Sequence, residues 1–331
     1  MVSVSMNIFS RKHFSFLLKL LVSGGFVMWL VWRINWSEVF VRILEVDLPY
    51  LALYIVLLVS GIILSARKWQ MIASAKGFVR PYGDFFRAYL TGTFINNFLP
   101  STIGGDTYRT LWLGRRDGAL SPAISTTLFD RFTGLWAAMV FAFLFSLFHL
   151  SLVFANPVWL ALILVIFLLL SIDFLFPVLR KRECVRTLFL MFPEKFQYLI
   201  REIVNYPIRR TVIPALGLSL VFNFVGVGLA NLVLFWALGG EVQVFQYLGV
   251  IFLVTIVSNI PVSINNIGLK EWAYATFFGY LGASVETAVA VAVTSRLIQM
   301  LVSFTAIPFY LRSRDLLGRE GDTLSEKENA V

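Results

Sequence analysis

The chain has 331 residues, of which 58% are hydrophobic and 14% are charged, whereas soluble domains average about 45–50% apolar and about 25% charged residues; this composition excludes a water-soluble domain. The 28 Lys and Arg residues outnumber the 19 Asp and Glu residues and cluster between apolar runs, which is typical of cytoplasmic loops beside anionic lipids rather than of a nucleic-acid-binding surface. A single cysteine and two histidines argue against a disulfide framework and against a metal site built from these residues.

Six apolar runs are long enough to cross the roughly 30 Å hydrocarbon core of a bilayer as helices. They cover residues 14–32, 48–66, 121–150, 157–179, 211–238 and 286–311. The first follows Arg11 and Lys12, as a signal peptide would, but no small-residue cleavage pattern follows it, so we interpret it as an uncleaved span. The sequence therefore predicts an all-α polytopic membrane protein with a single integral membrane domain over residues 1–314.

Two further apolar stretches are short, and each breaks at a proline. The stretch 85–99 ends at Pro100, and the stretch 244–260 ends at Pro261; a polar run with glycine follows each proline. One interpretation is a pair of broken re-entrant hairpins beside six full spans. The other is a pair of ordinary loops between short helices, which gives eight spans. The sequence leaves both open.

Basic residues in short loops predict the orientation of these segments. The loops at 67–80 and 180–210 carry much of the positive charge and are expected in the cytoplasm, together with both termini. The basic pair Arg115-Arg116 places both flanks of the first broken stretch on that side, whereas the second must begin and end outside. The two stretches are therefore expected to enter the membrane from opposite faces.

A comparison of the two halves around these breaks indicates an internal repeat. It sets Gly104 against Gly268 and Arg131 against Arg296. We therefore predict an inverted repeat, the architecture by which many transporters hold a substrate near the midplane of the bilayer. Repeat A covers about 48–150, and repeat B covers about 211–311.

Two polar segments lie outside the predicted spans. Apolar residues within 196–204 follow helical spacing in the basic loop, so this part is expected to form either an interfacial helix or a cap packed on the bundle. The polar tail at 315–331 is expected to be disordered.

Charged residues inside apolar runs are the first candidates for a functional site, because each costs about 2.5–3.5 kcal/mol at the centre of a span. Arg131 and Arg296 lie inside their runs, and Lys270 and Glu271 follow the second break. One interpretation is structural: an ion pair between Arg131 and Asp106 would hold the bundle together. A pair between Arg296 and Glu271 would do the same in the second half. The other interpretation is an anion site, since a guanidinium binds phosphate oxygens in a bidentate fashion.

The breaks themselves carry residues that free the backbone. The run Gly104-Gly105-Asp106 is followed by Arg109, so that successive N–H groups at the start of a helix would suit a phosphate. The same run is also typical of a plain turn followed by a helix N-cap. In the second break, Asn265 tolerates left-handed backbone and precedes Gly268. Such backbone must be buried in protein or line a wet cavity.

No Walker, dinucleotide-binding, serine-hydrolase or zinc-protease motif is present in the sequence. One enzymatic option remains, because Glu45 and Asp47 fall in the first outward loop, where membrane glycosyltransferases that use polyprenyl-phosphate sugars keep acidic residues. The alternative is structural, since Asp47-Leu48-Pro49 is also typical of the start of a helix.

Several motifs resemble the membrane region of the lysylphosphatidylglycerol synthase family, a bacterial and archaeal group of flippase-like proteins. The motifs are Arg67-Lys68-Trp69, Asn97-Phe98-Leu99-Pro100 with Gly104-Gly105-Asp106 and Arg109, Asp130-Arg131, and the run from Pro261 to Glu271. The resemblance covers about 10–312. Ser101, Thr102 and Asn266 stand where the family often has glycine, which affects the fine geometry of the turns rather than membership.

This resemblance implies movement or binding of a lipid. In the full-length synthases a soluble domain attaches lysine to phosphatidylglycerol, and the membrane part is credited with moving the product between leaflets. The present sequence contains no such soluble domain, which argues against aminoacyl transfer. The resemblance also implies a location in the cytoplasmic membrane of a bacterium or archaeon.

We therefore predict a lipid flippase for an anionic or phosphate-bearing lipid, without catalytic residues, cofactor, metal or nucleic-acid partner. The expected headgroup site consists of Gly104, Gly105, Asp106, Arg109, Arg131, Asn265, Gly268, Lys270, Glu271 and Arg296. The alternatives are a polyprenyl-phosphate-dependent glycosyltransferase and a non-catalytic membrane subunit beside a lipid-modifying enzyme.

Overall fold

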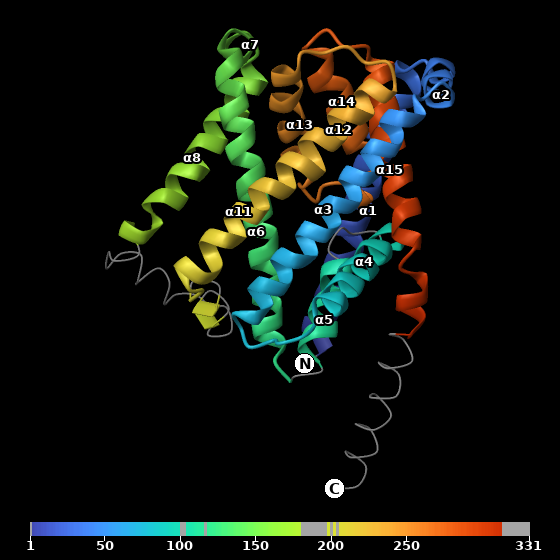
Figure 1. Ribbon diagram of the computed structural model, residues 1–331. Helices are drawn as coiled ribbons and strands as arrows, with labels where there is room; N and C mark the ends of the chain where they lie inside the picture. Colours follow the sequence, from blue (N-terminus) through green and yellow to red (C-terminus); the bar gives the residue numbers. More distant parts are fainter. Residues whose placement is uncertain are drawn as a thin grey trace, which may run out of the picture.

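The computed structural model describes residues 2–99, 104–115, 118–179, 197–198, 201–202 and 205–312, and side chains are described from residue 17 onward and not within 172–179. All regular structure in these residues is helical (Figure 1). The long helices are α1 (Val2–Arg33), α3 (Leu48–Ser74), α6 (Leu120–Ser146), α8 (Pro157–Leu179) and α15 (Val285–Phe304). A further long helix comprises η2 (Ile208–Val212), α11 (Ile213–Phe222), η3 (Asn223–Leu229) and α12 (Ala230–Ala237). The prediction of an all-α polytopic membrane protein is confirmed.

Within the described residues, four helical segments are long and apolar enough to cross a membrane, namely Leu48–Ser74, Leu120–Ala155, Ile208–Ala237 and Val285–Phe304. The second includes η1 (Leu147–His149) and α7 (Leu150–Ala155) after α6. A fifth span results if Leu17–Arg33 and Trp36–Leu44, the helix α2, count as one segment bent by 85°. These five match predicted runs. The sixth run is helical as α8, but its described apolar part, Pro157–Ser171, is shorter than a full crossing, so the number of spans stays a prediction.

Side-chain caps explain where several helices begin. The Asp47 carboxylate accepts a hydrogen bond from the Tyr50 backbone N–H at the start of α3, at 3.4 Å, and Pro49 lies in the first turn. Asn156 caps α8 by accepting from two backbone N–H groups at 3.1 Å. Asp47 therefore has the structural role that its sequence context indicated, and Glu45 is the C-cap residue of α2.

Two helical hairpins lie at opposite ends of the bundle (Figure 1). The first consists of α4 (Tyr82–Phe98) and α5 (Gly104–Gly114), which pack together. The second consists of α13 (Val244–Ser258) and α14 (Leu269–Gly279), joined through the short helix η4 (Ile264–Asn266). Both correspond to the predicted broken stretches. Residues 100–103, which join α4 to α5, lie outside the described part.

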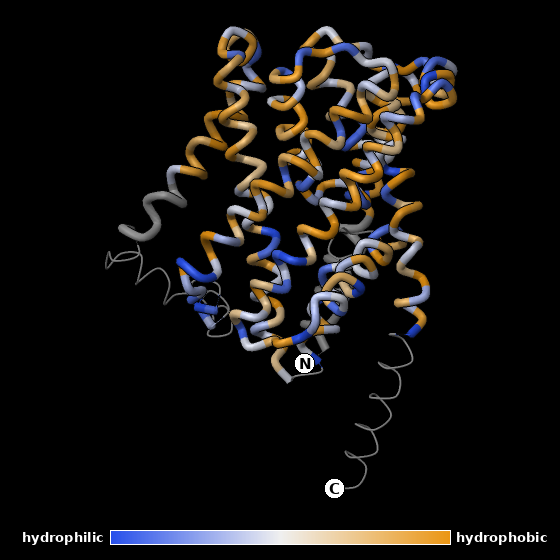
Figure 2. The backbone as a smooth tube through the Cα atoms, in the orientation of Figure 1, coloured by the Kyte–Doolittle hydropathy of each residue, from blue (hydrophilic) through white to orange (hydrophobic). Residues whose placement is uncertain are grey.

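Helices of each half of the chain pack against helices of the other half. Helix α3 runs along α11, η3 and α12, while α13 packs on α6 and α4 packs on α15. Glycine permits the closest approach, because a Cβ atom on Gly61 of α3 would lie 3.1 Å from the Gly226 Cα atom. Stacked phenylalanines join α6 to α13, with ring centroids of Phe141 and Phe252 4.9 Å apart. Figure 2 shows that the helices are mostly hydrophobic and that hydrophilic residues occur in short stretches between apolar ones.

Two predictions fall on parts of the chain that are not described. The amphipathic segment at 196–204 lies mostly outside the described residues, and the tail at 315–331 lies wholly outside them.

Candidate functional site

The first half of the chain contains a chain of ion pairs between α5 and α6. Arg109 on α5 donates to Asp106 Oδ1 at 2.6 Å and to Asp130 Oδ2 at 3.1 Å. Asp106 Oδ2 accepts from Arg131 Nε at 2.6 Å. The predicted ion pair between Arg131 and Asp106 is therefore confirmed, and it belongs to a larger network.

Lys68 completes this network from α3. Its Nζ atom lies 3.1 Å from Asp130 Oδ1 and donates to the hydroxyl of Ser219 at 3.0 Å, and the residue is only 3% exposed. Lys68 falls within the segment 67–80, which was expected to be a cytoplasmic loop. That assignment is wrong, because α3 continues to Ser74 and buries this residue inside the bundle. A buried ammonium is tolerated there because carboxylate and hydroxyl oxygens surround it.

The second half holds an arginine against the break itself. Arg296 on α15 donates from Nε to Glu271 Oε1 at 3.1 Å and from its two terminal nitrogens to the carbonyl oxygens of Asn265 and Asn266, at 3.0 and 3.1 Å. Glu271 Oε2 accepts from the Gly268 N–H at 2.8 Å. The predicted pair between Arg296 and Glu271 is confirmed, and together these bonds fix the backbone of the break.

Left-handed backbone explains the residue types at this break. Asn265, Asn266 and Gly268 have φ angles of 47°, 57° and 81°, a region that asparagine and glycine populate more readily than other residues. The backbone also lies against α1, because Ser23 Oγ accepts from the Ile264 N–H at 2.7 Å. The first helix therefore supports the second break directly.

Replacement of Gly268 with alanine is expected to lower the free energy of unfolding by about 1–3 kcal/mol, because the new Cβ atom would lie 2.6 Å from the Phe26 Cβ atom at a residue with φ +81°. Gly279, at the end of α14, has nothing within 4 Å of its Cβ position, so Gly279→Ala is the matched control. Unfolding of both purified variants in detergent checks this, and equal stabilities would contradict it.

The two halves thus share a geometric relation. In each, an acid in the short helix after a break pairs with an arginine 25 residues later, Asp106 with Arg131 and Glu271 with Arg296. The glycines beside the acids have bonded N–H groups: Gly105 donates to Asn96 Oδ1 at 2.6 Å, as Gly268 donates to Glu271. These N–H groups therefore hold the protein together in this structure rather than pointing into open space.

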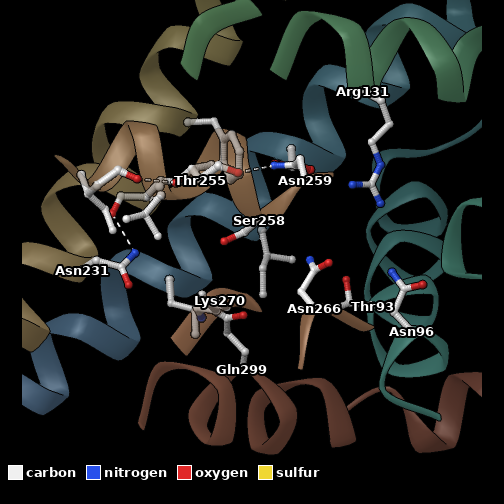
Figure 3. Close-up of a pocket in the computed structure, with 18 of the residues that line it drawn as sticks. Thr93, Asn96, Arg131, Asn231, Thr255, Ser258, Asn259, Asn266, Lys270 and Gln299 are labelled. Atoms are coloured by element: carbon white, nitrogen blue, oxygen red, sulfur yellow. Dashed lines mark hydrogen bonds between the residues drawn. The ribbon is translucent and has the colours of Figure 1, made fainter. Parts of the chain in front are cut away.

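A cavity of about 380 Å³ lies between the two halves (Figure 3). Arg131 reaches it from α6 on one side, and Lys270 of α14 lines it on the other. Neutral polar side chains complete much of the lining, among them Thr93, Asn96, Asn231, Ser258, Asn266 and Gln299. No carboxylate lines this cavity among the residues that the structure describes.

The predicted site residues divide into two groups. Arg131, Asn265 and Lys270 line the cavity. The others form the framework behind it: Gly104, Gly105, Asp106, Arg109, Gly268, Glu271 and Arg296. The side chain of Arg131 is 45% exposed, whereas that of Arg109 is 4% exposed, so the two arginines of the first network have different environments. Lys270 donates to Ser295 Oγ at 2.8 Å and makes no ion pair in the described part of the chain.

Sequence reasoning missed several members of the site. Thr93, Ser258 and Gln299 carry no local signal that would single them out, and only the packing of α4, α13 and α15 brings them together. Asp130 was recognised within a motif, but its bonds to Arg109 and Lys68 on other helices were not predicted.

The fold and this cavity define a multi-pass α-helical membrane protein with a polar cavity inside its helical bundle. The family described as lysylphosphatidylglycerol synthase TM region matches residues 16–306, and the chain belongs to this family. Comparisons with curated proteins and with solved structures found no match. The family expected from the sequence motifs is therefore confirmed.

Proposed function

We propose that the protein is a flippase that moves an anionic or phosphate-bearing lipid between the leaflets of the cytoplasmic membrane. The observation that carries this proposal is the cavity, which a basic side chain from each half lines and which no carboxylate of the described residues enters. Intramembrane ionisable groups that face a cavity mark substrate pathways more often than they mark lipid-facing surface.

The charge balance of the two networks supports an anionic ligand. The first network contains three basic residues and two acids, in the order Lys68, Asp130, Arg109, Asp106 and Arg131 along its contacts. In the second half, Lys270 and Arg296 stand against the single carboxylate of Glu271. Among the described residues, each of these two clusters therefore has one basic residue in excess, and a basic residue of each cluster lines the cavity. A headgroup phosphate would compensate this excess, with charge-assisted hydrogen bonds to Arg131 and Lys270.

We further propose that both hairpins are re-entrant and that the two halves form an inverted repeat. Helices α5 and α14 have 11 residues each and rise by only about 16 Å, about half of the hydrocarbon core. The hairpins lie at opposite ends of the bundle (Figure 1), and the acid-to-arginine separation is 25 residues in both halves. Such an architecture would place the cavity near the midplane of the bilayer. Cytoplasmic termini and the basic loop 180–210 remain part of this proposal.

Asp106 suggests how a headgroup would be taken up and released. Its carboxylate binds Arg131 at 2.6 Å and is also held by Arg109 at 2.6 Å. When a phosphate takes Arg131, Asp106 keeps one guanidinium partner, so that it is not left as an unpaired buried charge. When the phosphate leaves, Arg131 returns to Asp106.

A transport assay tests the proposed function. Proteoliposomes that carry fluorescently labelled phosphatidylglycerol would report transfer between leaflets, and the double variant Arg131→Ala with Lys270→Ala is expected to reduce its rate severalfold. Arg87→Ala is the matched control, since Arg87 is a basic residue of α4 with a 59% exposed side chain. Equal rates for the double variant, the control and the native protein would contradict the proposal.

A further inference from the structure

The lining of the cavity indicates more about its ligand than a negative charge. Its lining offers basic groups, amides, hydroxyls and apolar side chains, and among described residues it offers no acid. We infer that the cavity selects a phospholipid whose headgroup joins the phosphate to an uncharged, hydroxyl-bearing group, and that it rejects headgroups that carry an amine. This inference rests on the proposed function and narrows its substrate class.

Among the residues that the structure describes, an ammonium group would find no carboxylate partner at the cavity. Asp106 and Glu271, which pair with Arg131 and Arg296, do not line it, and each already accepts hydrogen bonds from two donors. The amine of such a headgroup would also face the like charges of Arg131 and Lys270, which repel it.

Of the three described aromatic residues that line the cavity, the two tyrosines already face basic groups of the protein. Tyr89 and Tyr274 both line the cavity, and an aromatic ring can bind a cation through its face. The Arg109 guanidinium already lies over the Tyr89 ring, 4.5 Å from its centroid, and Lys270 Nζ lies 5.8 Å from the centroid of Tyr274. Basic groups of the protein therefore occupy both rings.

Hydroxyl groups, in contrast, match the neutral part of the lining. The Ser258 Oγ atom is buried and has no hydrogen-bond partner within the described chain, although Ser258 lines the cavity. The side-chain amide of Asn266 also lines the cavity (Figure 3). A serine hydroxyl and an amide each donate and accept hydrogen bonds, as a ligand hydroxyl does, whereas an ammonium only donates.

The size of the cavity also favours an extended headgroup. Its volume of about 380 Å³ corresponds to about a dozen water molecules at about 30 Å³ each. A bare phosphate would leave much of this space unfilled, so the volume fits a phosphate with a polyol or a sugar attached.

Calorimetric titration of the purified full-length protein in detergent tests the selection. The probes are the short-chain lipids dihexanoyl phosphatidylglycerol and dihexanoyl phosphatidylethanolamine, with glycerol 3-phosphate as the soluble source of the same phosphate and hydroxyl chemistry. We expect phosphatidylglycerol to bind at least tenfold more tightly than either of the others. Equal or tighter binding of the ethanolamine lipid would overturn the inference, and equal or tighter binding of glycerol 3-phosphate would overturn the assignment to a lipid.

A substitution that adds a negative charge without changing the shape of the side chain gives a second test. Asn266→Asp puts a carboxylate into the cavity at a residue whose left-handed backbone aspartate also tolerates, and it should reduce the preference for phosphatidylglycerol to threefold or less. The control Asn156→Asp makes the same change at the N-cap of α8, outside the cavity, where aspartate caps equally well. An unchanged preference in Asn266→Asp would overturn the inference.

The two proposals fail in different ways. If Arg131→Ala with Lys270→Ala changes neither transport nor binding, the proposed function fails. If that variant abolishes both but the native protein prefers the ethanolamine lipid, the proposed function stands and only the selection is wrong.

Discussion

Replacement of Asp130 with asparagine is expected to lower the free energy of unfolding by about 3–5 kcal/mol, the usual cost of removing one partner from a buried ion pair. Asp130 is 5% exposed and is the carboxylate that Lys68 and Arg109 share. Arg109 keeps Asp106 in the variant, but Lys68 loses its one ion-pair partner among the described residues while 3% exposed. The loss of stability should therefore come mainly from the buried Lys68 ammonium, which no longer has a carboxylate partner among the described residues.

Unfolding by SDS in mixed micelles measures this effect, and two further variants locate its cause. Asp84→Asn breaks the pair of Asp84 with Arg87, whose side chains are 39% and 59% exposed, and should cost less than about 1 kcal/mol. Adding Lys68→Met to Asp130→Asn removes the stranded charge and should recover more than half of the loss. If Asp130→Asn cost no more than Asp84→Asn, the buried network would not be the stabilising element that we describe.

The residues of this network show where sequence reasoning succeeds and where it stops. The pairs of Arg131 with Asp106 and of Arg296 with Glu271 could be anticipated, because an intramembrane arginine requires a partner and each half offers one acid beside its break. Lys68 could not, because it stands at the end of an apolar run, where a span and a basic loop give the same local pattern. Its burial depends on α3 continuing to Ser74 and on α6 presenting Asp130 to it.

The same limit applies to the fold and to the cavity. Prolines and charge parity located both broken stretches, which are the helical hairpins of the structure. Residue spacing could not give the crosswise packing of α4 on α15 and of α13 on α6. That packing brings Thr93, Ser258 and Gln299 to one cavity.

The glycines at the breaks illustrate a second limit. A glycine-rich turn predicts either a phosphate nest or tight packing, and only coordinates distinguish the two. A Cβ atom at Gly105 would lie 2.0 Å from the carbonyl oxygen of Gly92, so α4 and α5 touch through their backbones there. In this structure the basic groups that line the cavity are the side chains of Arg131 and Lys270.

Replacement of Asp106 with asparagine should have opposite effects on binding and on transport. The carboxylate holds Arg131 at 2.6 Å, so a phosphate must first displace it. Without that charge, we expect dihexanoyl phosphatidylglycerol to bind about tenfold more tightly, which corresponds to about 1.4 kcal/mol. Transport of the labelled lipid should become slower by about the same factor, because no carboxylate then competes for Arg131 when the headgroup leaves.

Two controls separate this exchange from a general loss of acid charge. Glu271→Gln removes the equivalent acid of the second half. Glu271 binds Arg296 and the Gly268 N–H, neither of which lines the cavity. This variant should therefore lower the stability of the fold without tightening the binding of the lipid. Asp84→Asn removes an exposed acid that pairs with an arginine three residues later, as Asp106 does with Arg109, and should change neither quantity. Because tighter binding and slower release have one cause, they must appear together in Asp106→Asn. Weaker binding in that variant would mean that Asp106 belongs to the headgroup site itself. The proposal that Arg131 alternates between Asp106 and the lipid phosphate would then be wrong.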